Sequence, residues 1–359
     1  MRALTRRVHD ERGASAVVVA LVIVLLFGFT ALALDVAALV QERRELQNGA
    51  DAAALAVAKD CAAGTSCGAY LTTADNYADA NADDGQSNVD EVCGNGPGLT
   101  GCADPPTLPT GTQGYVRAVT STNEVSSPDN PDQVNYRFAP VLSDAFVGKT
   151  MHGSAVAAWG SPGSASVLPL TMSLCEYNLA TSNGTTYATP VAGNPPYSGN
   201  FRVIKFHTGN ARAQAADCAA QAGQDTDGNA RLPGGFGWLQ TLANCEVEVD
   251  VNGWYDEKPG AAAPGSSTGC DPSLFLNKVV LIPVFDDVNG LGGTNGEYHL
   301  EGFAAFYITG FRLSGGAWTV NPPCSPPADC IGGYFVQHVA VGEDFGGPSM
   351  GAVIVKMVG

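Results

Sequence analysis

The sequence has little charge, and the charge that it has is mostly negative. Charged residues make up 15% of the 359 residues, and 18 lysines and arginines stand against 35 acidic residues, for a net charge of −17. Residues 1–34 carry a net +2 from four arginines and two acidic residues, so the remainder carries −19. A body this acidic repels phosphate backbones, which argues against nucleic-acid binding.

Cysteine is absent before residue 61, and no two cysteines have the C-x-x-C spacing. Zinc-ribbon and thioredoxin-like sites therefore lack their basic motif. All ten cysteines follow an apolar segment, an arrangement that an oxidising compartment permits. The short spacings predict two local disulfides, Cys93–Cys102 and Cys324–Cys330, and leave the connectivity of the other cysteines open.

Charge is also absent from residues 14–34, which read ASAVVVALVIVLLFGFTALAL. At about 1.5 Å per residue this run spans roughly 31 Å, the thickness of a bilayer core. The arginines before it predict a basic cytoplasmic tail at 1–13, a transmembrane helix at 14–34 and an extracytoplasmic body. A signal peptide cut near Ala31-Leu32-Ala33 is the alternative, although the apolar run is longer than most such segments.

No proline occurs before residue 97, and helix-forming residues follow the apolar run. We therefore expect a helical stalk over residues 35–82, with a bend possible at Gly49. Small and apolar residues recur along it at helical spacing and predict a narrow stripe suited to packing on another helix or on the body. The stripe consists of Val36, Leu39, Val40, Leu46, Ala50, Ala53, Ala54 and Val57.

Three pieces around the apolar run resemble the N-terminal module of TadE/TadG-like proteins of the Flp (tight adherence) pilus assembly system. They are Arg12-Gly13-Ala14 before the run, Asp35 at its exit, and LQNGADAAALA at 46–56, so that the likeness covers residues 12–58. Relatives that are cut by a prepilin peptidase have glutamate at the fifth residue after the cleaved glycine. Val18 holds that place after Gly13, which favours the TadG-like branch.

The resemblance implies an accessory or structural component of a pilus-assembly or secretion system, with no enzymatic activity and no cofactor. Its expected partners are other membrane proteins of that system or pilins, and the lipid bilayer through one helix. The alternative is an extracellular adhesin or a pilus-associated minor subunit that binds a surface ligand.

Five residues are candidates for contact with a partner. Asp35 and Asp51 match the family pattern, and Gln47 lies one turn before Asp51 on the same helix face. A hydrated interface is the simpler interpretation of a carboxylate at a membrane exit. In the segment LPGGFGWL, Phe236 and Trp238 either pack in a core or form a docking patch.

The fold class expected is α+β, with a helical stalk followed by a mixed or antiparallel, disulfide-stapled β-rich ectodomain. A small β-containing region is predicted at 83–160, and a larger β-rich domain at 161–359 begins in the linker-like GSPGSAS. We expect a sandwich-like sheet arrangement there, with one helix at 211–222.

The motifs that suggest catalysis or metal binding are incomplete. Gly347-Pro348-Ser349-Met350-Gly351 fits the G-x-S-x-G pattern, but no acid or histidine follows it. The acidic turns at 225–229 and 286–290 do not match the EF-hand loop. We therefore expect no catalytic residues and no metal site.

Overall fold

The computed structural model describes residues 12–64, 66–123, 131–141, 143, 145–205, 236–239, 246–258, 272–289, 297–313, 317–319, 321–326, 330–340, 342 and 344–359. Three α-helices lie in these ranges, α1 (Arg12–Ala62), α2 (Tyr70–Asp79) and α3 (Leu174–Thr181), together with the 3-10 turns η1 (Ala139–Val141) and η4 (Pro272–Phe275). The chain forms two compact units. The first comprises Met1–Ala54, Leu71–Val92 and Arg117–Ala155, and the second Leu55–Tyr70, Cys93–Val116 and Val156–Gly359.

The strands confirm the predicted α+β class. Those that enter the first unit are β1 (Ser87–Gly94), β2 (Gly114–Thr122), β3 (Val134–Asn135), β4 (Gly148–Lys149) and β5 (His152–Gly160). The others are β6 (Ser164–Val167), β7 (Leu170–Ser173), β8 (Thr189–Pro190), β9 (Tyr197–Ser198), β10 (Phe201–Lys205), β11 (Phe236–Leu239), β12 (Val247–Asp250), β13 (Trp254–Lys258), β14 (Val279–Asn289), β15 (Glu297–Leu313), β16 (Ala317–Trp318), β17 (Cys330–Phe335), β18 (His338–Ala340) and β19 (Ala352–Met357).

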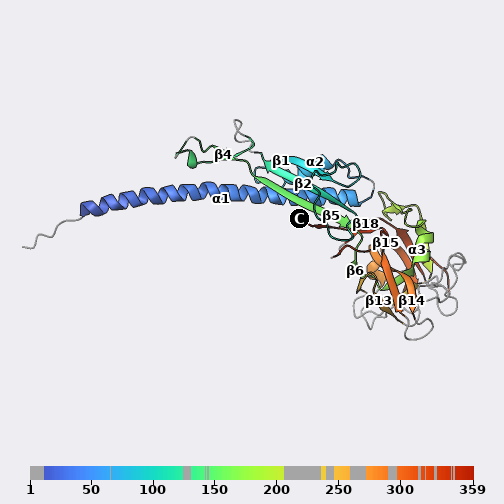
Figure 1. Cartoon of the computed structure of the whole chain (residues 1–359). Helices are drawn as coiled ribbons and strands as arrows, with labels where there is room; N and C mark the ends of the chain where they lie inside the picture. The colour runs from blue at the N-terminus through green and yellow to red at the C-terminus, as the bar shows by residue number, and fades with distance from the viewer. Residues whose placement is uncertain are drawn as a thin grey trace, which may run out of the picture. The chain divides into compact units, whose positions relative to one another are not determined.

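The long helix α1 passes through Gly28 and Gly49 without interruption (Figure 1). A Cβ atom at Gly49 would lie 3.2 Å from the carbonyl oxygen of Ala78 in α2, so the glycine allows the two helices to approach closely. The helix ends at Ala62, and Gly64 follows with a φ of +98°. Glycine in this conformation is a common helix stop. The expected stalk over 35–82 is therefore two helices, with a turn between them.

The first unit packs α1 on strands β2 and β5. Strands β1, β2 and β5 are consecutive neighbours in a five-stranded sheet of order β1-β2-β5-β19-β18. The residues of α1 next to them are buried and apolar, Leu46, Ala50, Ala53 and Ala54. The Thr120 hydroxyl in β2 donates to the Leu46 carbonyl at 2.8 Å, and a Cβ at Gly153 in β5 would meet the same carbonyl group at 2.5 Å. Small residues on the strands thus bring the helix backbone against the sheet.

The second unit contains an eight-stranded sheet whose pairings close on themselves. The order is β10-β17-β15-β13-β11-β7-β14, and β14 also pairs with β15. The eighth strand, β16, pairs with β15 outside this order. Strand β15 is 17 residues long and pairs with β13 near His299 and with β17 from Phe306 onward. Bulges in its ladder with β14 add curvature. The sheet therefore curls into a ring rather than the expected two-sheet sandwich.

Alternating residues of β14 and β15 point to opposite faces of this sheet, and both faces are buried. Ile282 and Phe306 belong to one apolar cluster, whereas Leu281 and Phe303 belong to the other. Helix α3 packs against the first cluster through Tyr177, and its N-terminus is capped by the Ser173 hydroxyl. Burial on both faces explains why β15 is almost continuously apolar in its second half.

The structure contains three disulfides between described residues, and two of them were predicted. The structure joins Cys93 to Cys102 and Cys324 to Cys330, the two local loops expected. It also joins Cys61 to Cys67, across the turn after α1. In addition Cys175 is disulfide-bonded. The helix expected at 211–222 lies outside the described residues.

Candidate functional site: the exposed faces of the N-terminal helix and a cavity in the second unit

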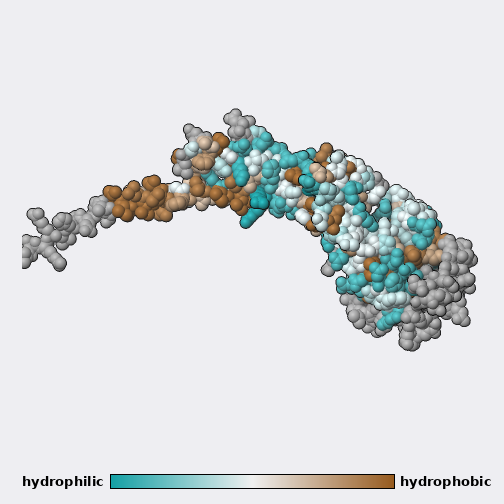
Figure 2. Space-filling view, in the orientation of Figure 1, coloured by the Kyte–Doolittle hydropathy of each residue, from teal (hydrophilic) through white to brown (hydrophobic). Residues whose placement is uncertain are grey.

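The first part of α1 is apolar and exposed. Its hydropathy and length suffice to cross a membrane, and the side chains of its most apolar stretch are unburied. Figure 2 shows this stretch as a continuous hydrophobic rod. Large apolar side chains from Val17 to Leu34 face solvent in the structure, an arrangement that is favourable only in an apolar surrounding.

Asp35 is the first charged residue after the apolar run, and it is only 6% exposed. One carboxylate oxygen accepts the backbone N–H of Arg137 at 2.8 Å, and the other accepts that of Ala139 at 2.7 Å. The N–H of Phe138 lies within 3.2 Å of both oxygens. The carboxylate therefore caps the free N–H groups at the start of η1, as an N-cap residue does for a helix.

Burial alone would raise the pKa of Asp35. The three backbone N–H groups, together with the positive charge of Arg137, outweigh that effect and hold the pKa below its usual value. Asp35 is thus ionised at neutral pH and fixed to a segment about a hundred residues away in sequence.

Gln47 and Asp51 also have partners inside the chain. The Gln47 amide group donates to the Asp51 carboxylate at 2.8 Å and to the Ser154 carbonyl at 2.9 Å, and its oxygen accepts the Ser154 N–H at 3.3 Å. The Gln47 side chain therefore both donates to and accepts from the backbone of Ser154 in β5. Contact of Asp35, Gln47 and Asp51 with another protein stays a prediction, whereas their contacts within the first unit are part of the fold.

The apolar stripe of the stalk divides into two parts. Beyond Leu46 it is buried in the body, but Val36 and Val40 are 53% and 45% exposed. A shallow groove runs along this exposed part, and we call it the membrane-proximal face. It is lined by Ala33, Val36, Ala37, Val40, Gln41 and Arg44. An apolar stripe with small residues is the surface that a second helix packs against.

Trp238 does not form a docking patch. It is 2% exposed and packs in the core of the second unit beside Leu170 and Ile331. Strand β11, which carries it, pairs with β7 on one edge and β13 on the other, so a central strand position buries the indole ring. The docking interpretation of Trp238 is therefore wrong. The side chain of Phe236 lies outside the described part of the chain.

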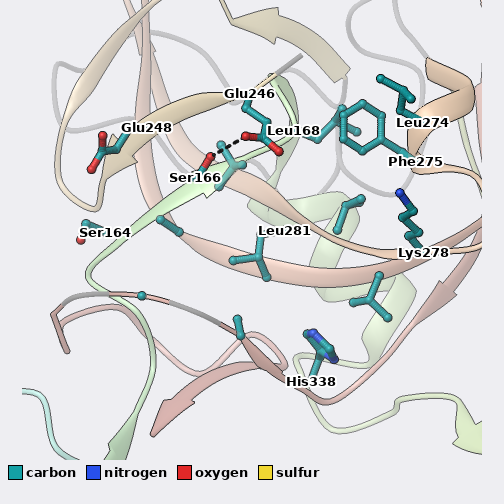
Figure 3. Close-up of a pocket in the computed structure, with 16 residues that line it drawn as sticks. Ser164, Ser166, Leu168, Glu246, Glu248, Leu274, Phe275, Lys278, Leu281 and His338 are labelled. Atoms are coloured by element: carbon teal, nitrogen blue, oxygen red, sulfur yellow. Dashed lines mark hydrogen bonds between the residues drawn. The ribbon is translucent and has the colours of Figure 1, made fainter. Parts of the chain in front are cut away.

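A cavity of about 720 Å³ opens in the second unit between β6, β12, β14 and β18. Figure 3 shows Glu246 and Glu248 on one side of it and Lys278 and His338 on the other. The Ser166 hydroxyl lies 3.5 Å from the Glu246 carboxylate. Desolvation of His338, with a smaller effect from the charge of Lys59, lowers the pKa of its imidazole. His338 is thus neutral at pH 7.

This lowered pKa predicts acid sensitivity. Because the folded state holds His338 with a pKa below that of the unfolded chain, its contribution to stability is present above about pH 6.5 and is lost as the pH falls through the folded value. We expect the melting temperature of H338Q to fall less than that of the wild type between pH 7.5 and 5.5. The control H152Q alters an exposed histidine of β5 and should follow the wild-type curve. Parallel curves for H338Q and the wild type would refute the prediction.

The fold and the helix define a class of protein: one that places a long, exposed apolar helix at its N-terminus and continues that helix into an α+β body. These features support membrane anchoring through α1. Residues 13–60 match the model of the Flp pilus-assembly TadE/G-like family, so the chain carries a TadE/G-like N-terminal module. No curated protein and no solved structure matches the chain.

The matched module covers the apolar run, Asp35 and the part of α1 that packs on β2 and β5. Sequence reasoning found Asp35 and Gln47 but missed Thr120, Gly153 and the segment that Asp35 holds. No local pattern marks those residues, since each acquires its role from a neighbour far away in sequence.

Proposed function

We propose that this protein is a membrane-anchored accessory component of a Flp-type pilus assembly or secretion system, and that it acts through contacts with other proteins rather than through catalysis. In this proposal the N-terminus is cytoplasmic and the body lies outside. The arginines before the apolar run and the disulfides after it support that orientation.

The observation that carries the proposal is the exposure of apolar side chains on the membrane-proximal face. The family match includes this part of α1, yet the chain's own body leaves Val36 and Val40 exposed. Farther along the same helix, at Leu46 and beyond, the body covers the stripe. A stripe that continues uncovered to the membrane fits a helix of another membrane protein of the machinery, because small residues such as Ala33 and Ala37 allow close helix approach.

Photo-cross-linking tests the proposal directly. A photoreactive residue at Val36 or Val40, in cells that assemble the pilus, should form an adduct with another membrane protein of the system or with a pilin. The matched control is Ala38, which is exposed on the same turn of α1 but is not among the residues that line the groove. We expect the yield to be severalfold lower at Ala38.

A charge in this face should weaken the contact. We expect V40D to lower both the cross-link from Val36 and pilus assembly by about tenfold or more, because it buries a carboxylate in an apolar interface. A38D should have little effect on either. Equal adduct yields from Val36 and Ala38, or full pilus assembly in V40D, would contradict the proposal that the membrane-proximal face binds another protein.

A further inference from the structure

The β3–β4 loop, residues 136–147, connects two short antiparallel strands of the first unit. Val134 pairs with Lys149 and Asn135 with Gly148, and the N–H of Tyr136 donates to the Val147 carbonyl at 3.1 Å. Within the loop, the η1 turn is closed by a bond from the N–H of Val141 to the Phe138 carbonyl. Backbone bonds therefore hold the described residues of the loop as an excursion from a hairpin.

Four large apolar side chains of this loop are exposed. Val141 is 85% exposed, and Phe138, Phe146 and Val147 are exposed as well. Scattered exposed apolar residues are normal on a protein surface, but four within ten residues form a patch. Exposure of such a patch to water is unfavourable, which indicates that something covers it in the cell.

The loop is held at the level where α1 leaves its apolar run. Asp35 follows Leu34 directly, and its carboxylate binds the N–H groups of Arg137, Phe138 and Ala139. Figure 1 shows the segment next to β4 extending beyond β1 and α2 toward the N-terminal end of α1. In Figure 2 hydrophobic surface beside the apolar rod belongs to the same region of the first unit.

We propose that the β3–β4 loop is a membrane-interface anchor, which inserts Val141, Phe146 and their apolar neighbours into the headgroup and upper acyl region of the bilayer that α1 crosses. The lipid surface is the occupant that the geometry favours, because the same carboxylate that marks the end of the apolar helix also fixes the loop. The loop that carries the patch is therefore fixed next to the end of the apolar run of α1.

The residues that flank the patch fit a lipid interface. Arg137 and Lys149 are exposed on either side of it, and Asp144 is the one acidic residue between them in the sequence. Basic side chains at the edge of an apolar patch reach lipid phosphates, and aromatic rings are favoured at the same depth. The proposal rests on membrane anchoring by α1 and does not require the partner contact of the membrane-proximal face.

A fluorescent label at position 141 tests the anchor in the full chain. The described cysteines are all disulfide-bonded, so V141C offers a thiol that an environment-sensitive dye can label selectively. The labelled chain is reconstituted in vesicles of phosphatidylcholine and phosphatidylglycerol, with and without lipids that carry a spin-label quencher near the top of the acyl chain. We expect severalfold stronger quenching at position 141 than at a control position.

The control is L71C, which places the dye on an exposed apolar position of α2 in the same unit. Ala78 of α2 packs on Gly49, 14 residues beyond Asp35, or about 21 Å along α1. Asp83, which follows α2, binds Gln41 nearer the membrane, so Leu71 at the start of α2 lies farther away still. A dye at Leu71 should stay in water.

Two results would overturn the inference. Equally weak quenching at positions 141 and 71 would show that the loop stays in water. A dye at 141 that is shielded without lipid quenching, and exposed again when the protein is diluted among more vesicles, would assign the patch to a second copy of the chain. Flotation of the vesicles measures anchoring by α1 separately, so failure of the loop to insert is distinguishable from failure of the anchor.

Discussion

Asp35→Asn should release the β3–β4 loop from α1. The asparagine side chain keeps the shape of aspartate but loses the negative charge and replaces one acceptor oxygen with a donor group that faces backbone N–H groups. A charged acceptor that serves three N–H groups is worth about 2 kcal/mol or more. We expect hydrogen exchange at the amides of residues 137–139 to become roughly 30-fold faster, because 1.4 kcal/mol corresponds to a factor of ten.

The matched control for this change is Asp51→Asn. Asp51 lies on the same helix, and its described bond is to the Gln47 amide rather than to the loop. Exchange at residues 137–139 should be unchanged in D51N. Protection that persists in D35N would mean that the loop is held by contacts other than the carboxylate.

The same contact should depend on pH in a defined direction. Because the folded state lowers the pKa of Asp35, its contribution is complete above the ordinary value of about 3.9 and is lost as the pH falls through the lower folded value. The loop is therefore expected to stay docked throughout the physiological range.

Gly153→Ala should separate α1 from the sheet of the first unit. A Cβ at this position would lie 2.5 Å from the carbonyl carbon and oxygen of Leu46 and 2.7 Å from the nitrogen of Gln47. All three are backbone atoms of α1, so no side chain can rotate to relieve the clash. The shift would also strain the bond from Thr120 to Leu46 and the paired bonds between Gln47 and Ser154.

Overpacking of this kind costs about 3 kcal/mol when backbones must move. We expect G153A to lower the denaturant midpoint of the first unit and to expose α1 residues near Leu46 to protease. Gly101→Ala is the control, since a Cβ there meets no atom within 4 Å and its φ is not positive. A normal midpoint in G153A would show that the helix and strand are less closely packed than the distances indicate.

The parts of the fold that depend on local sequence were predictable. The apolar run, the helical stretch after it, and the disulfides Cys93–Cys102 and Cys324–Cys330 all follow from neighbouring residues. The stop of α1 at Ala62 was missed because no proline marks it; the signal was Gly64 between two cysteines, Cys61 and Cys67.

The parts that depend on distant contacts were not predictable. Asp35 binds residues 102 to 104 positions away, and nothing near Arg137 indicates that its N–H group needs a carboxylate. The ring-like closure of the sheet likewise depends on one strand, β15, which pairs with different partners along its length. Periodicity shows that a strand is buried but does not show which strands lie at its edges.

The unbroken course of α1 also makes the anchor a lever. A hydrophobic segment that is longer than the local bilayer is thick responds by tilting. Since the helix enters the first unit without a kink, a tilt of about 10° would move the helix at Gly49, about 21 Å beyond Asp35, sideways by roughly 4 Å. A change in bilayer thickness would thereby displace strands β2 and β5, which pack on the helix.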